Sequence, residues 1–337
     1  MNILFTCVGR RNYLLNYFRE IISKEDRIFA TDMQISAPGM AEADVPIVVP
    51  SIYSPDYIPS LMKIIKGNKI DAIISLNDLE LPILSENRNK IESLECKLLV
   101  SNQRVIDITF DKLKTANFLS SIGLKTPLTF TKKEEFMSAY NKGDIKFPIV
   151  IKPRWGSASI GIEFPQTKEE FDLADQLSRI KLKRTILNEV SNADFEHAIL
   201  YQEKIDGKEY GMDILNDFEG NYVGTFVREK ISMRAGETDK AKSVCDNRFE
   251  VIGRTISQNL KHIGNLDCDI LEQNGSLYVL ELNPRFGGGY PFSHEAGAKG
   301  VYCYYFWIKG EKDIRSFINY KEGLVYSKCD RLIAVEK

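Results

Sequence analysis

Apolar runs alternate with amphipathic segments over roughly the first hundred residues. Residues 2–8 form an apolar run that ends at Gly9, and residues 12–22 place apolar side chains at helical spacing, which predicts a strand, a turn and a helix. The same reading predicts strands at residues 27–31, 71–76 and 97–101 and a helix at 56–65. Such alternation predicts a parallel sheet with helices on both faces.

The pattern changes after about residue 110. A helical periodicity over residues 111–122 stops at Gly123, and two strand-like runs, 147–152 and 160–164, flank a loop of small residues. The remaining predicted elements are strands at 198–203, 210–215, 222–229, 267–272 and 276–282 and a helix near 249–262. The last two strands are joined by the turn-forming Asn274-Gly275, so this part of the chain is expected to be of the α+β type.

Length and charge narrow the class of protein. A chain of 337 residues is longer than one compact core usually holds, so two or three packed units are expected. The 45 Lys and Arg residues against 47 Asp and Glu give a net charge of -2, so no global basic field is available to hold a nucleic acid. With 43% hydrophobic and 27% charged residues, the composition is that of an ordinary globular protein.

Targeting signals and soft metal ligands are missing from the sequence. No apolar run reaches the roughly 18 residues of a membrane span, and the N-terminal run lacks the preceding basic residues of a signal peptide, so we expect a cytoplasmic protein without a membrane partner. The six cysteines are dispersed and are expected to be reduced packing residues. With three histidines, any metal should be a hard ion bound through oxygen.

Three loops are expected at the carboxyl edge of the N-terminal sheet, where doubly wound folds bind ligands: Gly9-Arg10-Arg11, Asp32 and Asn77-Asp78. Gly9 does not begin a G-x-G-x-x-G fingerprint, which weakens the alternative of an NAD-dependent dehydrogenase. Asp32 would suit a ribose or, as a simpler alternative, face solvent at the end of its strand.

Residues 152–161 form the first candidate functional segment. Backbone N–H groups approach phosphate oxygens closely only where side chains are small, and Lys152 adds a positive charge at the end of the preceding strand. The segment predicts a phosphate cradle, with a simple hairpin as the alternative. A G-x-x-x-x-G-K-[ST] loop occurs nowhere in the chain, so a P-loop ATPase or kinase is disfavoured.

The second candidate cluster lies on two neighbouring strands, and the third lies earlier in the chain. Asp267 and Asp269 share one face of a strand, as do Glu281 and Asn283 on the next, and such carboxylate and amide oxygens are what Mg²⁺ prefers. Earlier in the chain, residues 201–210 offer backbone groups to a base edge, with Glu209 placed to accept from ribose hydroxyls. For the carboxylate and amide cluster, the alternative is a solvated hairpin with polar ends. For residues 201–210, the alternative is that the glutamates are simply solvated.

Taken in order, these segments resemble the ATP-grasp superfamily, specifically the carbamoyl-phosphate-synthase-like ATP-dependent carboxylate–amine ligases. The resemblance is carried by Asp111-Lys112-Leu113-Lys114, by Val150-Ile151-Lys152-Pro153 with its glycine/serine loop, and by the run from Glu281 to Gly289. It implies an α/β protein with a Rossmann-like N-terminal (pre-ATP-grasp) domain followed by a two-subdomain α+β ATP-grasp fold. The implied divisions are a pre-ATP-grasp domain at 1–110, a small subdomain with the phosphate loop at 111–205, and a large subdomain with the metal site and a C-terminal extension at 206–337.

The resemblance also implies roles for single residues and the cofactors ATP and Mg²⁺, with Mn²⁺ as an alternative metal. Lys112 and Lys152 would hold the ATP phosphates. The closing loop would contain Gly156, Ser157, Ala158, Ser159 and Gly161. The adenine would lie against Gln202, Glu203 and Ile205, and the ribose against Glu209. The metal ligands would be Asp269, Glu281 and Asn283. Arg285, Lys152 and Arg234 would be catalytic, Arg234 as part of a family loop running from Arg228 to Glu237.

We therefore expect a ligase that activates a small-molecule carboxylate as an acyl phosphate and joins it to an amine or ammonia, releasing ADP and phosphate. Amidation of a sugar (uronic) acid in surface-polysaccharide synthesis is the preferred reading. An amino-acid or peptide ligase and a non-catalytic nucleotide sensor are the alternatives. A single unit without an internal repeat argues against a full carbamoyl phosphate synthase. A homodimer is a further expectation, and His294 is either a proton acceptor or a structural histidine.

Overall fold

The apolar runs of the first hundred residues form one parallel sheet. The computed structural model describes residues 1–156 and 161–335. The strands β1 (Asn2–Thr6), β2 (Arg27–Asp32), β3 (Val45–Val48), β4 (Ala72–Ser75) and β5 (Lys97–Leu98) are arranged in the order β3-β2-β1-β4-β5, and every pair is parallel. The helices of this N-terminal unit are α1 (Asn12–Arg19), α2 (Pro38–Ala41), α3 (Tyr57–Asn68), α4 (Leu81–Glu86), α5 (Arg88–Glu92) and α6 (Gln103–Phe110).

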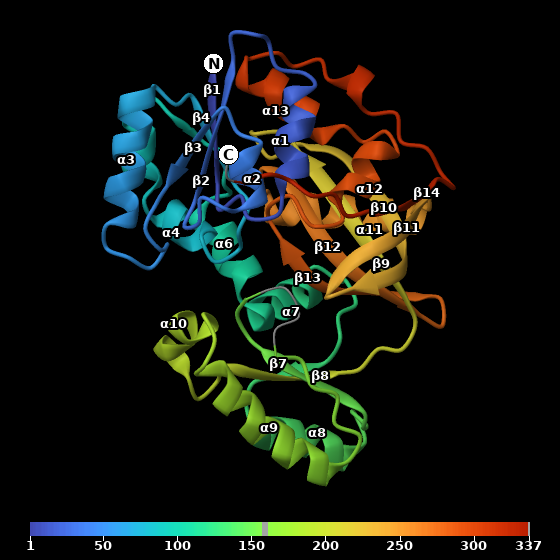
Figure 1. Ribbon diagram of the computed structural model, residues 1–337. Coiled ribbons are helices and arrows are strands. Elements are labelled where there is room, and N and C mark those ends of the chain that lie inside the picture. The colour runs from blue at the N-terminus through green and yellow to red at the C-terminus, as the bar shows by residue number, and fades with distance from the viewer. Residues whose placement is uncertain (157–160, 336–337) are drawn as a thin grey trace.

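Both faces of the central strands β1, β2 and β4 are buried, which explains why these strands are mostly apolar. Leu4 belongs to the same hydrophobic cluster as Leu61 of α3, whereas its neighbour Phe5 belongs to a cluster with Phe18 of α1. The second cluster also includes Tyr305 of α13 (Gly300–Ile308), so it continues from the N-terminal unit into the C-terminal part of the chain. The N-terminal unit therefore packs against the rest of the molecule through a shared core (Figure 1).

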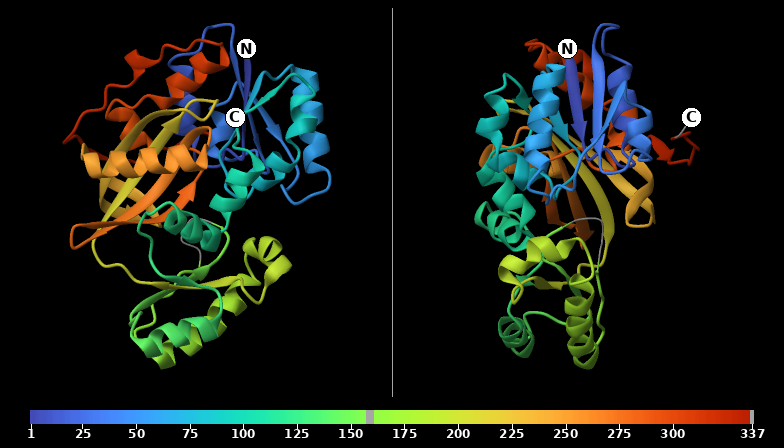
Figure 2. Two further views of the ribbon diagram at one scale, coloured as in Figure 1. Left: turned by 180° about the vertical axis from the view of Figure 1, so that it is seen from behind. Right: turned by 60° about the vertical axis from the view of Figure 1, so that its left-hand side comes forward.

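The middle of the chain forms a small unit with its own sheet, which lies apart from the other two in every view (Figures 1 and 2). The sheet has the order β6-β8-β7, and Phe136 and Phe171 pack on it with their ring centroids 4.7 Å apart. Its elements are β6 (Thr129–Phe130), α8 (Lys133–Lys142), β7 (Ile149–Pro153), α9 (Lys168–Leu182), α10 (Leu187–Ser191), the 3-10 helix at Asn192–Asp194 and β8 (Ile199–Glu203), and α7 (Lys112–Ser121) precedes them.

A six-stranded antiparallel sheet forms the large unit, with α11 (Asn247–Leu260) packed against β9 and β10. Its order is β13-β12-β9-β10-β11-β14. The strands are β9 (Lys208–Asn216), β10 (Tyr222–Arg234), β11 (Glu237–Val244), β12 (Gly264–Gln273), β13 (Ser276–Asn283) and β14 (Val325–Ser327), and the other elements are α12 (Tyr290–Glu295), α13 (Gly300–Ile308) and a 3-10 helix at Arg315–Phe317. The predicted fold class is confirmed: a parallel α/β unit followed by two α+β units.

Two local predictions were wrong. The strand expected at residues 160–164 is reduced, in its described residues 161–164, to the single bridge between Ile151 and Glu163; residue 160 lies outside the described residues. The segment from Arg228 to Glu237 is not a loop: it is the end of β10, a turn at Ala235 and Gly236 with positive φ, and the start of β11. Cross-strand pairing with β9 and β11 extends β10 through polar residues that the apolar pattern could not mark.

The cysteines are all free thiols. Cys96, Cys268 and Cys303 are buried as expected, and Cys7 is partly buried, but Cys245 and Cys329 are exposed, so the packing interpretation was wrong for those two. In the part of the chain that is described, none of the helices has the length and apolar character to cross a bilayer.

Candidate functional site

A cavity of about 380 Å³ lies between the small unit and the sheet of the large unit. Val150, Ile162, Leu187, Leu271 and Leu280 give it apolar walls that suit a planar ring. The sequence-predicted residues that line it are Lys112, Lys152, Gly156, Gln202, Glu203, Ile205, Glu209, Asp269 and Glu281. Residues separated by up to 169 positions in the chain (281 − 112) are thus brought to one cavity.

Lys152 lies near the end of β7, with its side chain directed into this cavity. It is only 8% exposed, and burial lowers its pKa to about 8. The negative charge of Glu281 opposes that shift, while the positive charge of Lys112 adds to it. A buried ammonium beside a second lysine is electrostatically costly until an anion joins the two, which is the task of a phosphate-binding pair.

Lys112 begins α7, and its ammonium donates to the carbonyl of Gly156. The helix is fixed to the small unit by its N-cap residue Asp111, whose carboxylate accepts from Arg154 at 2.7 and 2.9 Å. Gly156 has φ +97°, and a Cβ there would lie 2.5 Å from Leu187, so the position requires glycine. Ser157, Ala158 and Ser159 lie outside the described residues, and Gly161 has φ +70°.

The three predicted metal ligands lie together on β12 and β13. Asp269 is directly opposite Glu281 in the strand pairing, and Asn283 donates to the Glu281 carboxylate at 3.2 Å. Among the residues the structure describes, no group of three or more His, Cys, Asp and Glu side chains is arranged to hold a metal ion, so this candidate site consists of two carboxylates and one amide. Such a donor set fits Mg²⁺, which takes few ligands from a protein and completes its shell with water and substrate phosphates.

Lys230, which the sequence analysis missed, links the metal and ribose candidates. Its ammonium is 2.7 Å from Asp269 and 2.7 Å from Glu209. Burial raises the pKa of Asp269; Lys230 opposes that shift, and the facing Glu281 adds to it. The signal was present in the sequence, because Arg228 and Lys230 alternate on one face of a strand.

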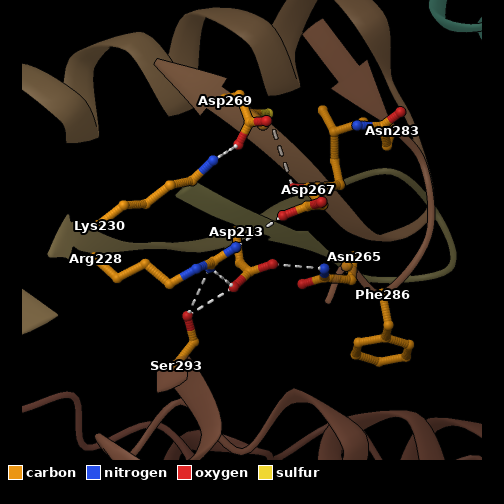
Figure 3. A network of polar contacts seen from close by, with 12 residues as sticks. Asp213, Arg228, Lys230, Asn265, Asp267, Asp269, Asn283, Phe286 and Ser293 are labelled. Atoms are coloured by element: carbon orange, nitrogen blue, oxygen red, sulfur yellow. Dashed lines mark hydrogen bonds and ion pairs between the residues drawn. The ribbon is translucent and has the colours of Figure 1, made fainter. Parts of the chain in front are cut away.

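Figure 3 shows part of a second group of buried charges, around Asp213, Arg228 and Asp267. Arg228 pairs with Asp213 and, at 2.8 Å, with Asp267. Arg285 pairs with Asp267 at 3.1 Å and with Asp78 of the N-terminal unit at 2.7 Å. We call these five residues the junction network. Each arginine is thus held by two carboxylates, and Arg285 is not among the residues that line the cavity.

The glycines that follow Arg285 have a packing role in this network. A Cβ on Gly287 would lie 2.1 Å from the Asp267 carboxylate, and one on Gly289 would lie 2.3 Å from Nε of Arg228. Buried charged groups therefore approach the backbone more closely than any side chain would allow. Two of the three glycines that carried part of the family resemblance, Gly287 and Gly289, are required by this approach.

The adenine candidates lie at the rim of the small unit. Gln202 donates to Thr129 at 2.8 Å, Glu203 accepts from the backbone of Leu128 at 3.1 Å, and Ile205 is buried. Arg234, in contrast, is not brought to the cavity. It pairs with Asp239 and Asp330 on the exposed side of the β10–β11 turn, which itself contributes Met233 and Gly236 to the lining.

The remaining candidates, His294, Arg11 and Asp32, have contacts that fit structural roles. His294 stacks on Tyr17 with ring centroids 3.7 Å apart, and burial lowers its pKa to about 3, which fits a neutral structural histidine. Arg11 is partly buried and donates to the carbonyls of Leu76 and, at 3.1 Å, Phe286, while Arg10 is exposed. Asp32 accepts from the backbone N–H of Gly9 at 2.9 Å and so holds the loop after β1.

Comparisons with known protein families agree with this arrangement. The model of the ATP-grasp domain matches residues 109–289, and the model of the PylC-like N-terminal domain matches residues 3–99. The first match covers more than half of the chain and includes both lysines, the cavity and the metal candidates. The chain belongs to the ATP-grasp family of ligases.

Among curated relatives, the carbamoyl phosphate synthase large chain of Gemmatimonas aurantiaca is 23% identical over 66% of this chain and 21% of that protein. The carbamoyl-phosphate synthase of Methanobrevibacter smithii is 26% identical over 66% of this chain and 59% of that protein. The chain spans about a fifth of the length of the large chains it matches.

Solved structures share the fold. The N5-carboxyaminoimidazole synthetase from Staphylococcus aureus, complexed with ADP, has a TM-score of 0.68 at 16% identity, covering 92% of this chain and 78% of that one. The biotin carboxylase from Campylobacter jejuni has a TM-score of 0.70 at 16% identity, covering 94% of this chain and 72% of that one. These likenesses extend over all three units of the fold.

Proposed function

We propose that this chain is an ATP-dependent ligase that activates a small-molecule carboxylate as an acyl phosphate and couples it to an amine or ammonia, releasing ADP and phosphate. The observation that carries the proposal is the meeting of Lys112, Lys152, Asp269 and Glu281 in one cavity between two sheets. Two cations opposite a carboxylate pair are what a nucleotide triphosphate with a divalent metal needs. The division at residues 110 and 205 and the cytoplasmic location belong to the proposal.

In this proposal the chain acts on ATP by position and charge. Phosphoryl transfer needs cations around the transferred group and little covalent chemistry from the protein. Lys112 and Lys152 hold phosphate oxygens, and the apolar walls take the adenine ring. Asp269, Glu281 and Asn283 hold Mg²⁺, for which Mn²⁺ is the substitute, and the metal supplies neutralisation of phosphate charge when bound.

Lys230 connects the metal-binding side of the cavity to the ribose-binding side. Because its ammonium contacts both Asp269 and Glu209, it fixes the distance between the two carboxylates before any ligand enters. Arg285 would hold the acceptor or the transferred phosphate, as the family resemblance implies, and the apolar strand residues around the cavity exclude water from the acyl phosphate.

For the substrate, we propose a sugar (uronic) acid, with an amino-acid or peptide carboxylate as the alternative. The N-terminal unit reaches the junction network through Asp78 and Arg11, so an acceptor would meet groups of both signs there. A non-catalytic nucleotide sensor is the competing function. The retained set of two lysines, two carboxylates and an amide favours an enzyme, because a sensor has no need of all five.

A ligand-binding experiment tests the nucleotide part of this proposal. MgATP at a hundredfold excess over its dissociation constant should stabilise the folded chain by about 2.7 kcal/mol in a thermal melt. NADH serves as the control and should give no comparable shift. A shift with NADH and none with MgATP would favour the dehydrogenase alternative and contradict the ligase.

A substrate screen tests the catalytic part. Uronic acids and amino acids are combined with ammonia or amines, ADP release is followed, and mass spectrometry identifies the product. We expect ADP release to depend on one carboxylate and on Mg²⁺, and Glu281→Gln to abolish it while Glu250→Gln, an exposed carboxylate on α11, leaves it unchanged. Nucleotide binding without carboxylate-dependent ADP release across the screen would favour the sensor.

A further inference from the structure

Asp78 is a carboxylate of the N-terminal unit, held in a rigid loop at the carboxyl edge of its sheet. The loop follows β4, and the Asn77 side chain accepts from the backbone N–H of Leu79 at 3.0 Å. The next residue, Glu80, is fully buried and accepts from Thr6 at 2.7 Å and Ser75 at 2.6 Å. These bonds tie the loop to both β1 and β4, so Asp78 is presented to the neighbouring unit from a fixed backbone.

The partner of Asp78 is Arg285, on the other side of the unit boundary. One Nη of Arg285 lies 2.7 Å from Asp78 and the other 3.1 Å from Asp267. Arg285 is 7% exposed, and its Nε has no hydrogen-bond partner among the described residues. One guanidinium is therefore held by carboxylates of two different units, with one donor left over.

The charges around Arg285 balance. Besides the junction network of Asp78, Asp213, Asp267, Arg228 and Arg285, the partly buried Arg11 lies close enough to Arg285 for the two positive charges to disfavour each other. Three carboxylates thus face three guanidinium groups in a region shielded from water. An anion that approaches Arg285 meets a neutral cluster, so it gains little unless one carboxylate gives way.

Asp78 also lies next to the predicted reaction centre. It lines a small cavity, about 10 Å³, together with Lys112, Gly156, Glu281 and Asn283. The N-terminal unit therefore places a carboxylate beside a phosphate-binding lysine and two of the metal candidates. Arg285, which Asp78 contacts, directly follows Pro284, another residue that lines this small cavity.

We propose that Asp78 is a positioning residue of the reaction centre: its carboxylate occupies Arg285 as an internal counter-ion, and an anion that binds Arg285 must displace it. The inference rests on the proposed function for the identity of that anion, the transferred phosphate or the acceptor carboxylate. Asp78 in this role makes the N-terminal unit a determinant of anion affinity at Arg285. The contact is exchanged when the anion arrives and restored when it leaves.

Inorganic phosphate is the probe, titrated into the full chain by calorimetry with and without MgADP. Asp78→Asn keeps the size of the side chain and removes its charge, which leaves the cluster with one excess positive charge, so phosphate should bind at least about fivefold tighter than to the unmodified chain. Asp78→Glu restores the charge and should return the affinity to within about twofold. The matched control is Glu20→Gln, which removes another carboxylate that accepts from across the boundary, here from Tyr302 at 2.6 Å.

The outcomes separate this inference from the proposed function. Unchanged phosphate affinity in Asp78→Asn, the same gain in Glu20→Gln, or a gain that persists in Asp78→Asn/Arg285→Gln would overturn it. Absence of MgADP binding would refute the proposed function, while the titration without nucleotide still decides the role of Asp78. If Asp78→Asn does not fold, a crystal structure of the unmodified chain with phosphate decides: phosphate on Arg285 with the Asp78 contact broken supports the inference, and an intact contact contradicts it.

Discussion

Strand β12 contributes one aspartate to each of two groups of charged residues. The two groups differ in how fully their charges are paired. Asp267 of β12 belongs to the junction network, where each arginine is held by two carboxylates. Two residues later, Asp269 faces the cavity, where Glu281 lies directly opposite it and Lys152 forms no ion pair with any described residue. In the first group each arginine faces two carboxylates. In the second, Lys230 pairs with Asp269, but like charges remain side by side, with Glu281 opposite Asp269 and Lys112 near Lys152, and a metal and phosphates would offset them.

The difference separates scaffold from site. A buried ion pair that is fully satisfied gives little net stability but is very costly to break. Neighbouring carboxylates and neighbouring lysines are costly while they remain unliganded, and they are kept where a metal and phosphates bind. Breaking the pairs of Arg228 with Asp213 and Asp267 should therefore damage the fold, and changing the cavity should damage binding and turnover.

The largest effect is expected in the junction network. Arg228→Met leaves Asp213 and Asp267 without their shared cation and should lower the free energy of unfolding by about 3–5 kcal/mol. Urea denaturation measures this. The exposed Arg254→Met, on α11, is the control and should change stability by less than about 0.5 kcal/mol. Equal values for the two variants would contradict the distinction between scaffold and surface.

Next in size is the loss of Lys152. Lys152→Ala removes one of the few cations that oppose charge on the transferred phosphoryl group, so turnover should fall roughly 10²–10³-fold, with weaker MgATP binding. Lys152→Arg should restore little, because a planar fork needs more room than an ammonium. Steady-state ADP release is the measurement. Full activity in a folded Lys152→Ala would remove this lysine from the phosphate site.

Glu281→Gln should reduce turnover at least about a hundredfold, which corresponds to about 2.7 kcal/mol of transition-state stabilisation. The amide weakens the metal site and leaves the packing of β13 intact, so the melting temperature without ligand should stay close to that of the unmodified chain. Raising the Mg²⁺ concentration should recover part of the activity. A folded variant with normal ADP release at low Mg²⁺ would exclude Glu281 as a metal ligand.

The pH dependence of nucleotide binding gives a smaller effect. Lys152 is protonated below its pKa of about 8 and loses its charge above it, so MgATP affinity should be constant below pH 7 and about tenfold weaker at pH 9. The free energy of unfolding of the ligand-free chain should instead rise between pH 8 and 10.5, because the unfolded state then binds more protons than the folded state. Lys152→Ala should lack both trends, as calorimetry and urea denaturation at several pH values would show.

The smallest effect is expected for Arg234, which lies on the exposed side of the β10–β11 turn in ion pairs with Asp239 and Asp330. Arg234→Ala should change turnover by less than about threefold, because exposed ion pairs contribute about 1 kcal/mol or less. A loss comparable to that of Lys152→Ala would show that this arginine reaches the reacting groups when ligands are bound.

The sequence by itself determined the class of fold and named many of the residues that line the cavity. Short apolar runs and amphipathic segments depend only on local side chains. They located the parallel N-terminal sheet and the strands that carry Lys152, Asp269 and Glu281. The ordered motifs then gave the family. Such features are encoded within a few neighbouring residues, so the pattern is readable without the fold.

Only the tertiary structure decided how the charges are paired. The sequence cannot tell that Asp267 belongs to the junction network and Asp269 to the cavity, because both lie on one face of one strand and differ only in what packs opposite them. It likewise gave Arg285 and Arg234 similar roles, although one is buried between two carboxylates and the other is exposed on a turn. Partners such as Asp78 and Arg285 are 207 positions apart, and their interaction is a product of how the units dock.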